Sequence, residues 1–388
     1  MKHDQRFMWL DLIRGLCAIS VCAGHLRSAI LADYTSLEST SLIQKALYLA
    51  TGFGHQSVMV FFVLSGFFVG GAVLKNRDTF NWKKYAIARL SRLWVVLIPA
   101  LLVTALVDQW LAVHAPDVLS GRYRGAWNSG PSPDEVYSAS PATFFANVFF
   151  LQTVVAPVFG TNGPLWSLAN EFWYYLLLPL CVAALGPVGE NTKASTVYRL
   201  GTGALALAVL LWLPAGIVSG YYVWLLGLLA YHFIGRLTPR GAHAMTCIGV
   251  VCFGAALAYS KAASWQGALG VPSDLAVGGG FCVLCIALAN LRHLGGAPSW
   301  LFRMARASSE FSYSLYLLHF PLVVLIASRF YRSGKLTPDA AGMARFSFWL
   351  VALLAVCIVF WWLFERRTSD IRRWVVERMV HRLGRHVS

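Results

Sequence analysis

The chain has 388 residues, of which 57% are hydrophobic and only 13% are charged. Soluble globular proteins carry about 25% charged residues, so a chain with this composition could not cover its surface in water. The composition excludes a soluble domain and predicts an all-α, polytopic integral membrane protein. The 32 Lys and Arg residues outnumber the 17 Asp and Glu residues, but they lie between apolar runs rather than on a basic nucleic-acid-binding module.

Ten apolar segments are each long enough for a helix to cross the hydrocarbon core, which needs about 20 residues. They are expected at 8–30, 53–74, 93–113, 164–186, 198–216, 219–235, 243–260, 272–291, 310–329 and 343–364. With both termini in the cytoplasm, the cytoplasmic segments hold more than twice as many Lys and Arg residues as the external ones. Counting the short apolar segment 142–156 as an eleventh span would reverse this excess. We therefore predict about ten spans, cytoplasmic termini, and a re-entrant or interfacial segment at 142–156.

The predicted membrane domain covers residues 1–370, and residues 371–388 form a basic cytoplasmic tail. Apolar residues recur at helical spacing among the tail arginines, which is typical of a helix on an anionic inner leaflet. The longest segment outside the membrane, 114–163, is either an ordered functional loop or a surface connector. All eight cysteines lie in apolar segments, so we expect no metal site.

The first span carries polar residues along one helical face. Asp11, Arg14, Ala18 and His25 are separated by three, four and seven residues, so they align on a helix. In a purely structural interpretation, Arg14 extends to the lipid headgroups and pairs with Asp11, and His25 is a hydrogen-bonded core residue. Three aligned polar residues inside a span favour function instead, with His25 able to take up and return a proton near neutral pH.

Other spans also carry polar side chains, which are costly in lipid and expected to face a hydrated cavity. Hydrogen bonding between helices is the structural alternative. These residues are Ser65 in the second span, Trp166, Ser167 and Glu171 in the fourth, and Tyr316 and His319 in the ninth.

A basic cluster precedes the third span on the predicted cytoplasmic side. It includes Lys84 and the pair Arg89 and Arg92, which share one helix face. Membrane topology alone would produce a basic loop here. A paired arginine face is also suited to an anionic cytosolic ligand such as a nucleotide phosphate.

Six motifs, in order along the whole chain, resemble the integral-membrane acyltransferase-3 family, which acylates saccharides and related acceptors. Two residues differ from the family's usual pattern: Asn170 stands where an apolar residue is commoner, and Arg367 stands where a proline usually follows the last motif. The motifs are Arg14 with His25 eleven residues later, Phe61-Phe62-Val63-Leu64-Ser65-Gly66-Phe67, Arg89-Leu90-Ser91-Arg92, Gly163-Pro164-Leu165-Trp166-Ser167-Leu168 with Glu171, Ser312-Tyr313-Ser314-Leu315-Tyr316-Leu317-Leu318-His319, and Phe364-Glu365-Arg366.

The resemblance implies an acyl-CoA donor, acetyl-CoA in the simplest case, and a hydroxyl of an envelope or exported saccharide as acceptor. It implies that His25 is the base, with transient acylation of this histidine as the open alternative. It also implies that Arg14 engages the donor and is oriented by Asp11, and that Lys84, Arg89 and Arg92 hold the CoA phosphates. The remaining polar residues would bind the acceptor; these are Ser65, Trp166, Ser167, Glu171, Tyr316 and His319.

The same resemblance implies the bacterial inner membrane as location, the stand-alone form of the family, and acyl-CoA as a co-substrate with no tightly bound cofactor. The identity of the glycan and the oligomeric state, monomer or homo-oligomer, stay open. The rival class is a polytopic transporter or flippase for a lipid-linked or small anionic solute, in which the polar residues line a path. The lack of an internal repeat and the separation of an inner basic cluster from an outer aromatic loop favour the enzyme. A membrane sensor would explain the spans but not the alignment of Arg14 with His25.

Overall fold

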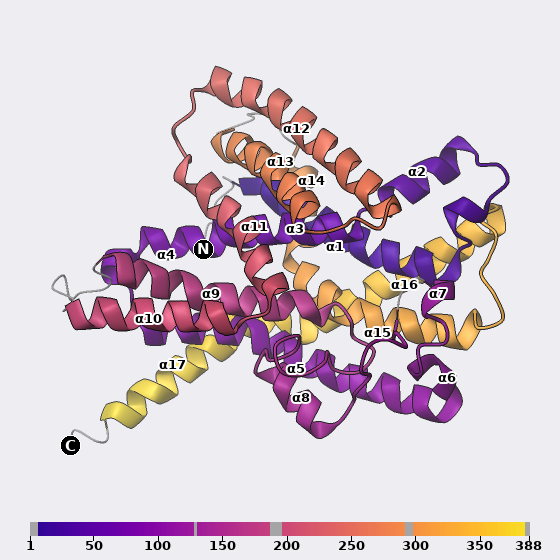
Figure 1. Ribbon diagram of the computed structural model, residues 1–388, viewed down its shortest axis with the longest axis horizontal. Coiled ribbons are helices and arrows are strands. Elements are labelled where there is room, and N and C mark those ends of the chain that lie inside the picture. Colours follow the sequence, from indigo (N-terminus) through magenta and orange to yellow (C-terminus); the bar gives the residue numbers. More distant parts are fainter. Residues whose placement is uncertain (1–6, 128–129, 187–195, 292–297, 385–388) are drawn as a thin grey trace. The chain divides into compact units, whose positions relative to one another are not determined.

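The computed structural model describes residues 7–127, 130–186, 196–291 and 298–384, and this part of the chain is built from helices without a named strand (Figure 1). Nine helical segments within it are long and apolar enough to cross a membrane. The protein is therefore an all-α, polytopic membrane protein, as predicted. The spans are α1 (Met8–Ile30), α3 to α4 (Gly54–Lys75), α5 (Trp82–His114), α9 (Leu165–Leu185), α11 (Ala215–His232), α12 (Pro239–Trp265), α13 (Val271–Asn290), α15 (Ser312–Phe330) and α16 (Ala340–Leu363), which continues toward α17 (Thr368–Gly384).

The fifth predicted span, 198–216, differs from the others. The structure has α10 (Thr196–Trp212) here, with 17 residues. At 1.5 Å per residue this helix is about 25 Å long, somewhat less than the hydrocarbon core of about 30 Å. The preceding residues, 187–195, lie outside the described part of the chain.

The doubtful segment 142–156 is not a span. It contains α8 (Pro141–Val148), a helix of eight residues, followed by turns. Ser140 caps this helix by accepting a hydrogen bond from the backbone N–H of Thr143 at 3.2 Å. A helix of eight residues is about 12 Å long and cannot cross the bilayer.

The chain folds into two compact units, each built from segments that are distant in sequence. The first unit comprises Met1–Gly24, Ser41–Phe80 and Ser167–Ser312, and the second comprises His25–Thr40, Asn81–Trp166 and Tyr313–Ser388. The boundary falls within α1, which therefore contributes to both units. The tail helix α17 belongs to the second unit and ends at Gly384, so residues 385–388 of the predicted tail lie outside the described residues.

In the first unit, glycines bring α3 and α11 into close contact. A Cβ atom on Gly66 would lie 1.9 Å from the carbonyl oxygen of Trp224, and one on Gly227 would lie 1.9 Å from that of Val63. No side chain fits at either position, so the two backbones touch. Gly66 also begins η3 (Gly66–Gly70), one turn of π-helix within the second span. In the same unit α12 and α13 lie side by side (Figure 1).

In the second unit, the predicted external loop is ordered by buried polar side chains. The Asp108 carboxylate at the end of α5 accepts hydrogen bonds from the Thr161 backbone N–H at 2.9 Å and the Thr161 hydroxyl at 2.7 Å. The Asn162 amide donates to the carbonyl oxygen of Leu317 in α15 at 2.9 Å. Gln152 donates to the carbonyl oxygen of Leu165, at the start of α9, at 3.0 Å. Of the two interpretations of this loop, the structure supports an ordered segment rather than a loose connector.

Candidate functional site

The helix α1 runs without interruption from Met8 to Ile30 and carries Asp11, Arg14 and His25. Eleven residues separate Arg14 from His25, which is a rotation of about 1100°, or a net 20°, and a rise of about 16 Å. The two residues therefore lie on one face of one helix, as the spacing predicts. Arg14 belongs to the first unit and His25 to the second.

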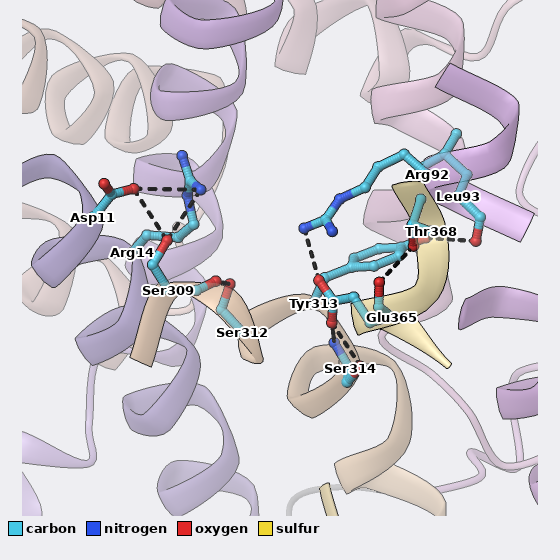
Figure 2. A network of polar contacts seen from close by, with 10 residues as sticks. All are labelled: Asp11, Arg14, Arg92, Leu93, Ser309, Ser312, Tyr313, Ser314, Glu365 and Thr368. Carbon is cyan, nitrogen blue, oxygen red and sulfur yellow. Dashed lines mark hydrogen bonds and ion pairs between the residues drawn. The ribbon is translucent and has the colours of Figure 1, made fainter. Parts of the chain in front are cut away.

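Arg14 and Asp11 are joined through a third residue that the sequence did not single out. Figure 2 shows the Ser309 hydroxyl, from the end of α14 (Ser299–Glu310), between the two side chains. Arg14 Nη1 donates to Ser309 Oγ at 3.2 Å, and Ser309 Oγ donates to Asp11 Oδ1 at 3.1 Å. The direct distance from Arg14 Nη1 to Asp11 Oδ1 is 3.6 Å. Asp11 and Ser309 thus both lie against the guanidinium.

The guanidinium of Arg14 also lies over an aromatic ring from the second span. Its Cζ atom is 4.7 Å from the centroid of the Phe68 ring. Phe68 belongs to the π-helical turn η3, and such turns often occur at functional sites because they redirect side chains. A cation over a ring face is attracted by the ring quadrupole, which adds to the positioning by Asp11 and Ser309.

Ser65 and Glu171 belong to one directed chain of hydrogen bonds in the first unit. The Trp224 indole N–H can only donate, and it donates to Ser65 Oγ at 3.1 Å. The Tyr175 hydroxyl donates its proton to Glu171 Oε2 at 3.2 Å. In the 3.1 Å hydrogen bond between Ser65 Oγ and the Tyr175 hydroxyl, Ser65 is therefore the donor. The chain runs from Trp224 through Ser65 and Tyr175 to the Glu171 carboxylate. The sequence predicted Ser65 and Glu171 but not Tyr175 or Trp224.

In the second unit, His25 lies against two residues of α15. The centroids of the His25 and His319 rings are 5.3 Å apart, with 46° between their planes. Phe320 meets the His25 ring edge to face at 4.7 Å. His25 is half-buried, and its ring makes no hydrogen bond to any described residue.

His319 is fully buried, and its hydrogen bonds determine which ring nitrogen carries the proton. Nδ1 is 2.9 Å from the carbonyl oxygens of Leu315 and Tyr316, which can only accept hydrogen bonds. Nδ1 is therefore the protonated nitrogen, and Nε2 carries the lone pair of the neutral ring. No described residue gives this buried Nε2 atom a hydrogen bond. An unpaired buried acceptor is costly, so it points to a role.

The other predicted acceptor residues lie where α9 begins and along α15. Tyr316 donates to the carbonyl oxygen of Pro164 at 3.3 Å, which joins α15 to the segment that enters α9. Trp166 and Ser167 follow in the first turn of α9, with Ser167 buried and Trp166 half-buried. Trp166 and Tyr316 belong to the second unit, whereas Ser167 and Glu171 belong to the first.

The three predicted phosphate-binding residues share α5 but differ in their surroundings. Lys84 is exposed in the first turn. Arg89 is half-buried, and its Cζ atom lies 5.9 Å from the Tyr85 ring centroid. Arg92 instead forms an ion pair, because its Nη2 atom is 2.7 Å from Oε1 of the buried Glu365 (Figure 2). Glu365 belongs to a motif quoted above, but no spacing in the sequence indicates that it meets Arg92.

The ordered loop carries a cluster of charges of its own. Arg332, just after α15, donates to the carboxylate of Asp117 and to the hydroxyl of Tyr123. The hydrogen bond from the Arg332 guanidinium and, after it, the one that the Tyr123 hydroxyl donates to Asp117 at 3.0 Å hold the pKa of Asp117 below its usual value. Burial raises the pKa of Tyr137 further along the loop, and the neighbouring Asp108 carboxylate adds to this shift.

The described residues contain no group of three or more His, Cys, Asp or Glu side chains that could hold a metal ion. A family model described as an acyltransferase domain matches residues 7–365, which is nearly the entire chain. No curated protein and no solved structure matches this sequence.

Proposed function

Because the chain belongs to the acyltransferase-3 family, we propose that it transfers an acyl group, acetyl in the simplest case, from cytosolic acyl-CoA to a hydroxyl of an envelope or exported saccharide. Its location would be the bacterial inner membrane, where the donor and the acceptor meet from opposite sides. The observation that carries the proposal is the half-buried imidazole of His25 beside the oriented imidazole of His319.

The reaction needs a base more than it needs an activator of the donor. A thioester is already reactive, so the main barrier is to deprotonate the hydroxyl and to stabilise the tetrahedral oxyanion. His25 accepts the hydroxyl proton as the oxygen attacks the thioester carbonyl carbon. The carbon–sulfur bond then breaks, and the CoA thiolate takes the proton back from His25. The products are the acylated saccharide and free CoA.

The unpaired nitrogen of His319 supports this role for His25. In the resting protein, an unpaired buried acceptor costs about 1–3 kcal/mol. Once His25 has taken a proton, both of its ring nitrogens are donors, and the lone pair of His319 Nε2 is the acceptor on the neighbouring ring. Protonation of His25 strengthens such a hydrogen bond, so the contact stabilises the charged form of the base, and with it the transition state, more than the neutral ground state.

Arg14 and the basic residues of α5 serve the donor in this proposal. Arg14, held by Asp11 and Ser309, engages the anionic or carbonyl part of the donor arm. Its planar, permanently charged guanidinium is suited to an oxyanion. Lys84 and Arg89 lie in the first turns of α5, where they would bind the CoA phosphates.

In this proposal, polar and aromatic side chains of the two units bind the hydroxyl-rich acceptor. Glu171, which terminates the hydrogen-bond chain from Trp224, is an acceptor for sugar hydroxyls, and Trp166 provides an aromatic face. Ser167 of the first unit and Tyr316 of the second are the other residues that the resemblance assigns to the acceptor. Gln152 and Asn162 use their amide N–H groups on backbone carbonyls, so their buried side-chain oxygens stay without a donor among the described residues.

The direct test is transfer of label from acetyl-CoA to glycan. The purified protein in lipid vesicles is incubated with acetyl-labelled acetyl-CoA and envelope polysaccharide, and the glycan is analysed. We expect label in the glycan for the unsubstituted protein and none above background for His25→Ala. The exposed His243 on α12 supplies a matched control, and His243→Ala should transfer label normally.

Two results would contradict the proposal. Near-normal transfer by a correctly inserted His25→Ala protein would remove His25 from the chemistry. Movement of intact solute across the vesicle, with no label in any glycan, would support the transporter.

A further inference from the structure

Arg89 and Arg92 are one turn apart on α5, yet their charges are satisfied differently. Both arginines belong to the second unit, as do the residues that surround them. The sequence gives no reason to separate them, because two arginines at i and i+3 on a cytoplasmic helix face look equivalent. Their partners in the structure distinguish them.

Arg92 is committed to a carboxylate within the protein. Its Nη2 atom is 2.7 Å from Glu365 Oε1, with the geometry of an ion pair rather than of a linear hydrogen bond. The Arg92 Cζ atom also lies 5.6 Å from the Tyr313 ring centroid. The Tyr313 hydroxyl in turn donates to the carbonyl oxygen of Leu93 at 3.2 Å (Figure 2).

Glu365 is the centre of this arrangement. It is only 3% exposed and lies in η5 (Glu365–Arg367), directly after α16. Its Oε2 atom accepts the backbone N–H of Ser314 at 3.0 Å and the Ser314 hydroxyl at 2.6 Å. Ser314 lies in the first turn of α15, where backbone N–H groups lack helical partners and the helix dipole favours a negative charge. Glu365 thus ties the end of α16 to the start of α15 and to α5.

A buried carboxylate of this kind depends on its cation. Burial penalises the charged form, and two hydrogen bonds from Ser314 do not neutralise it. If Arg92 moved away to bind a phosphate, Glu365 would lose its counter-ion. Arg92 is therefore poorly placed to serve as a ligand of a mobile anion.

Arg89 is in the opposite situation. No carboxylate among the described residues forms an ion pair with it, and its Nε atom is buried without a hydrogen-bond partner in that part of the chain. Its Cζ atom lies 5.9 Å from the ring centroid of Tyr85, one turn earlier on α5. The guanidinium therefore has unused donors and an uncompensated charge.

We propose that the two arginines of this motif have different tasks: Arg89 binds a phosphate of the acyl-CoA donor, and Arg92 with Glu365 is an internal clamp that positions α5 against α15 and α16. This assignment rests on the proposed function for Arg89 alone. The clamp is a property of the folded chain and holds whatever the protein binds.

The clamp is tested by thermal unfolding of the purified protein in detergent, without donor. Arg92→Gln and Glu365→Gln should each lower the midpoint by several degrees, and the double variant should lose clearly less than the sum of the two. Arg89→Gln combined with Glu365→Gln is the matched control, and its effects should be additive. Additive effects for Arg92 with Glu365 would overturn the clamp. If Arg92→Gln alone does not fold, recovery of folding in the double variant demonstrates the coupling, and a double variant that also fails to fold would contradict the clamp.

The ligand assignment is tested by titrating the same proteins with CoA in nanodiscs of neutral lipid. Arg89→Gln should weaken CoA binding at least tenfold, whereas Arg92→Gln with Glu365→Gln should bind CoA within about threefold of the unsubstituted protein. Equal losses for Arg89 and Arg92 would overturn the division of tasks. Unchanged CoA binding by Arg89→Gln in neutral lipid, with weaker retention of anionic lipid in nanodiscs that contain it, would assign Arg89 to a headgroup and overturn its role toward the donor.

The two experiments separate this inference from the proposed function. Absence of CoA binding by the unsubstituted protein would overturn the proposed donor and the task of Arg89 together. The thermal experiment contains no donor, so it decides the clamp in either case.

Discussion

The imidazole of His319 donates its Nδ1 proton to the carbonyl oxygen of Leu315 at 2.9 Å, which leaves its other nitrogen as a buried acceptor. The ring of His25 lies beside it, with 5.3 Å between the centroids. One imidazole is therefore fixed in a single tautomer by backbone, while the other is half-buried and makes no hydrogen bond to any described residue. The proposed function assigns these two rings the roles of a base and of the acceptor that its protonated form meets.

Replacing His319 should lower the rate more than it affects binding. His319→Leu removes the acceptor for protonated His25, and a hydrogen bond to a charged group contributes about 1.5–3 kcal/mol, so kcat should fall by about ten- to hundredfold with KM for acyl-CoA nearly unchanged. His319→Gln keeps a polar acceptor and should recover part of the rate. Steady-state kinetics on the three proteins checks this. A His319→Leu protein with normal kcat would show that the second imidazole only fills space.

Ser309 should matter through Arg14. The hydroxyl connects Asp11 and Arg14, and Ser309→Ala removes both hydrogen bonds while leaving the two charges in place. At about 0.5–1.5 kcal/mol for a hydrogen bond, we expect kcat/KM to fall by about three- to tenfold. Ser308→Ala is the matched control, because the Ser308 hydroxyl donates only to the backbone of Ala305. Equal effects at the two serines would contradict a specific role for Ser309.

The contact between α3 and α11 should not tolerate a methyl group. Gly227→Ala would place Cβ 1.9 Å from the carbonyl oxygen of Val63, so the helices must separate at a cost of about 1–3 kcal/mol. The same separation would draw Trp224 away from Ser65. A lower unfolding midpoint together with reduced transfer is expected. Gly279→Ala on α13 is the control, since nothing lies within 4 Å of its added methyl. An unshifted midpoint for Gly227→Ala would contradict the backbone contact.

The ordered loop should loosen in acid. The hydrogen bond from Arg332 lowers the pKa of Asp117 in the folded protein, so the stabilisation is fully present above the ordinary carboxyl pKa of 3.8. It is lost as the pH falls through the lowered value and Asp117 becomes protonated. Hydrogen exchange of residues 115–127 should therefore be constant from neutral pH to about 5 and should rise, after correction for intrinsic rates, near pH 3. In Arg332→Gln this exchange should already be fast at neutral pH, and an unchanged profile would contradict the pairing.

The spans were predictable because each depends on a local property. A run of about 20 apolar residues defines a helix in lipid whatever it packs against, and so nine spans lie where the sequence places them. The exception, α10, is a helix that falls short of the required length. The alignment of Arg14 and His25 was predictable for the same reason, since the geometry of a single helix fixes it.

The partners of those residues were not predictable, because they come from distant segments. Ser309 is 298 residues from Asp11, and His319 is nearly as far from His25. Both residues belong to motifs that are visible in the sequence, Arg92 in the paired-arginine motif and Glu365 in the last one. Only the fold brings their side chains together. The tautomer of His319 is equally a property of packing, because it depends on where the carbonyls of Leu315 and Tyr316 point.

The loop between α5 and α9 is attached at its two ends and open in its middle. Asp108 and Asn162 hold the end that enters α9, and Arg332 holds the end that leaves α5, whereas Asp134, Glu135 and Val136 are exposed. Extra residues inserted between 133 and 137 would therefore hang outside the anchors. Such an insertion would lengthen the exposed segment, while the hydrogen bonds of Asp108, Asn162 and Arg332 would still hold both ends of the loop.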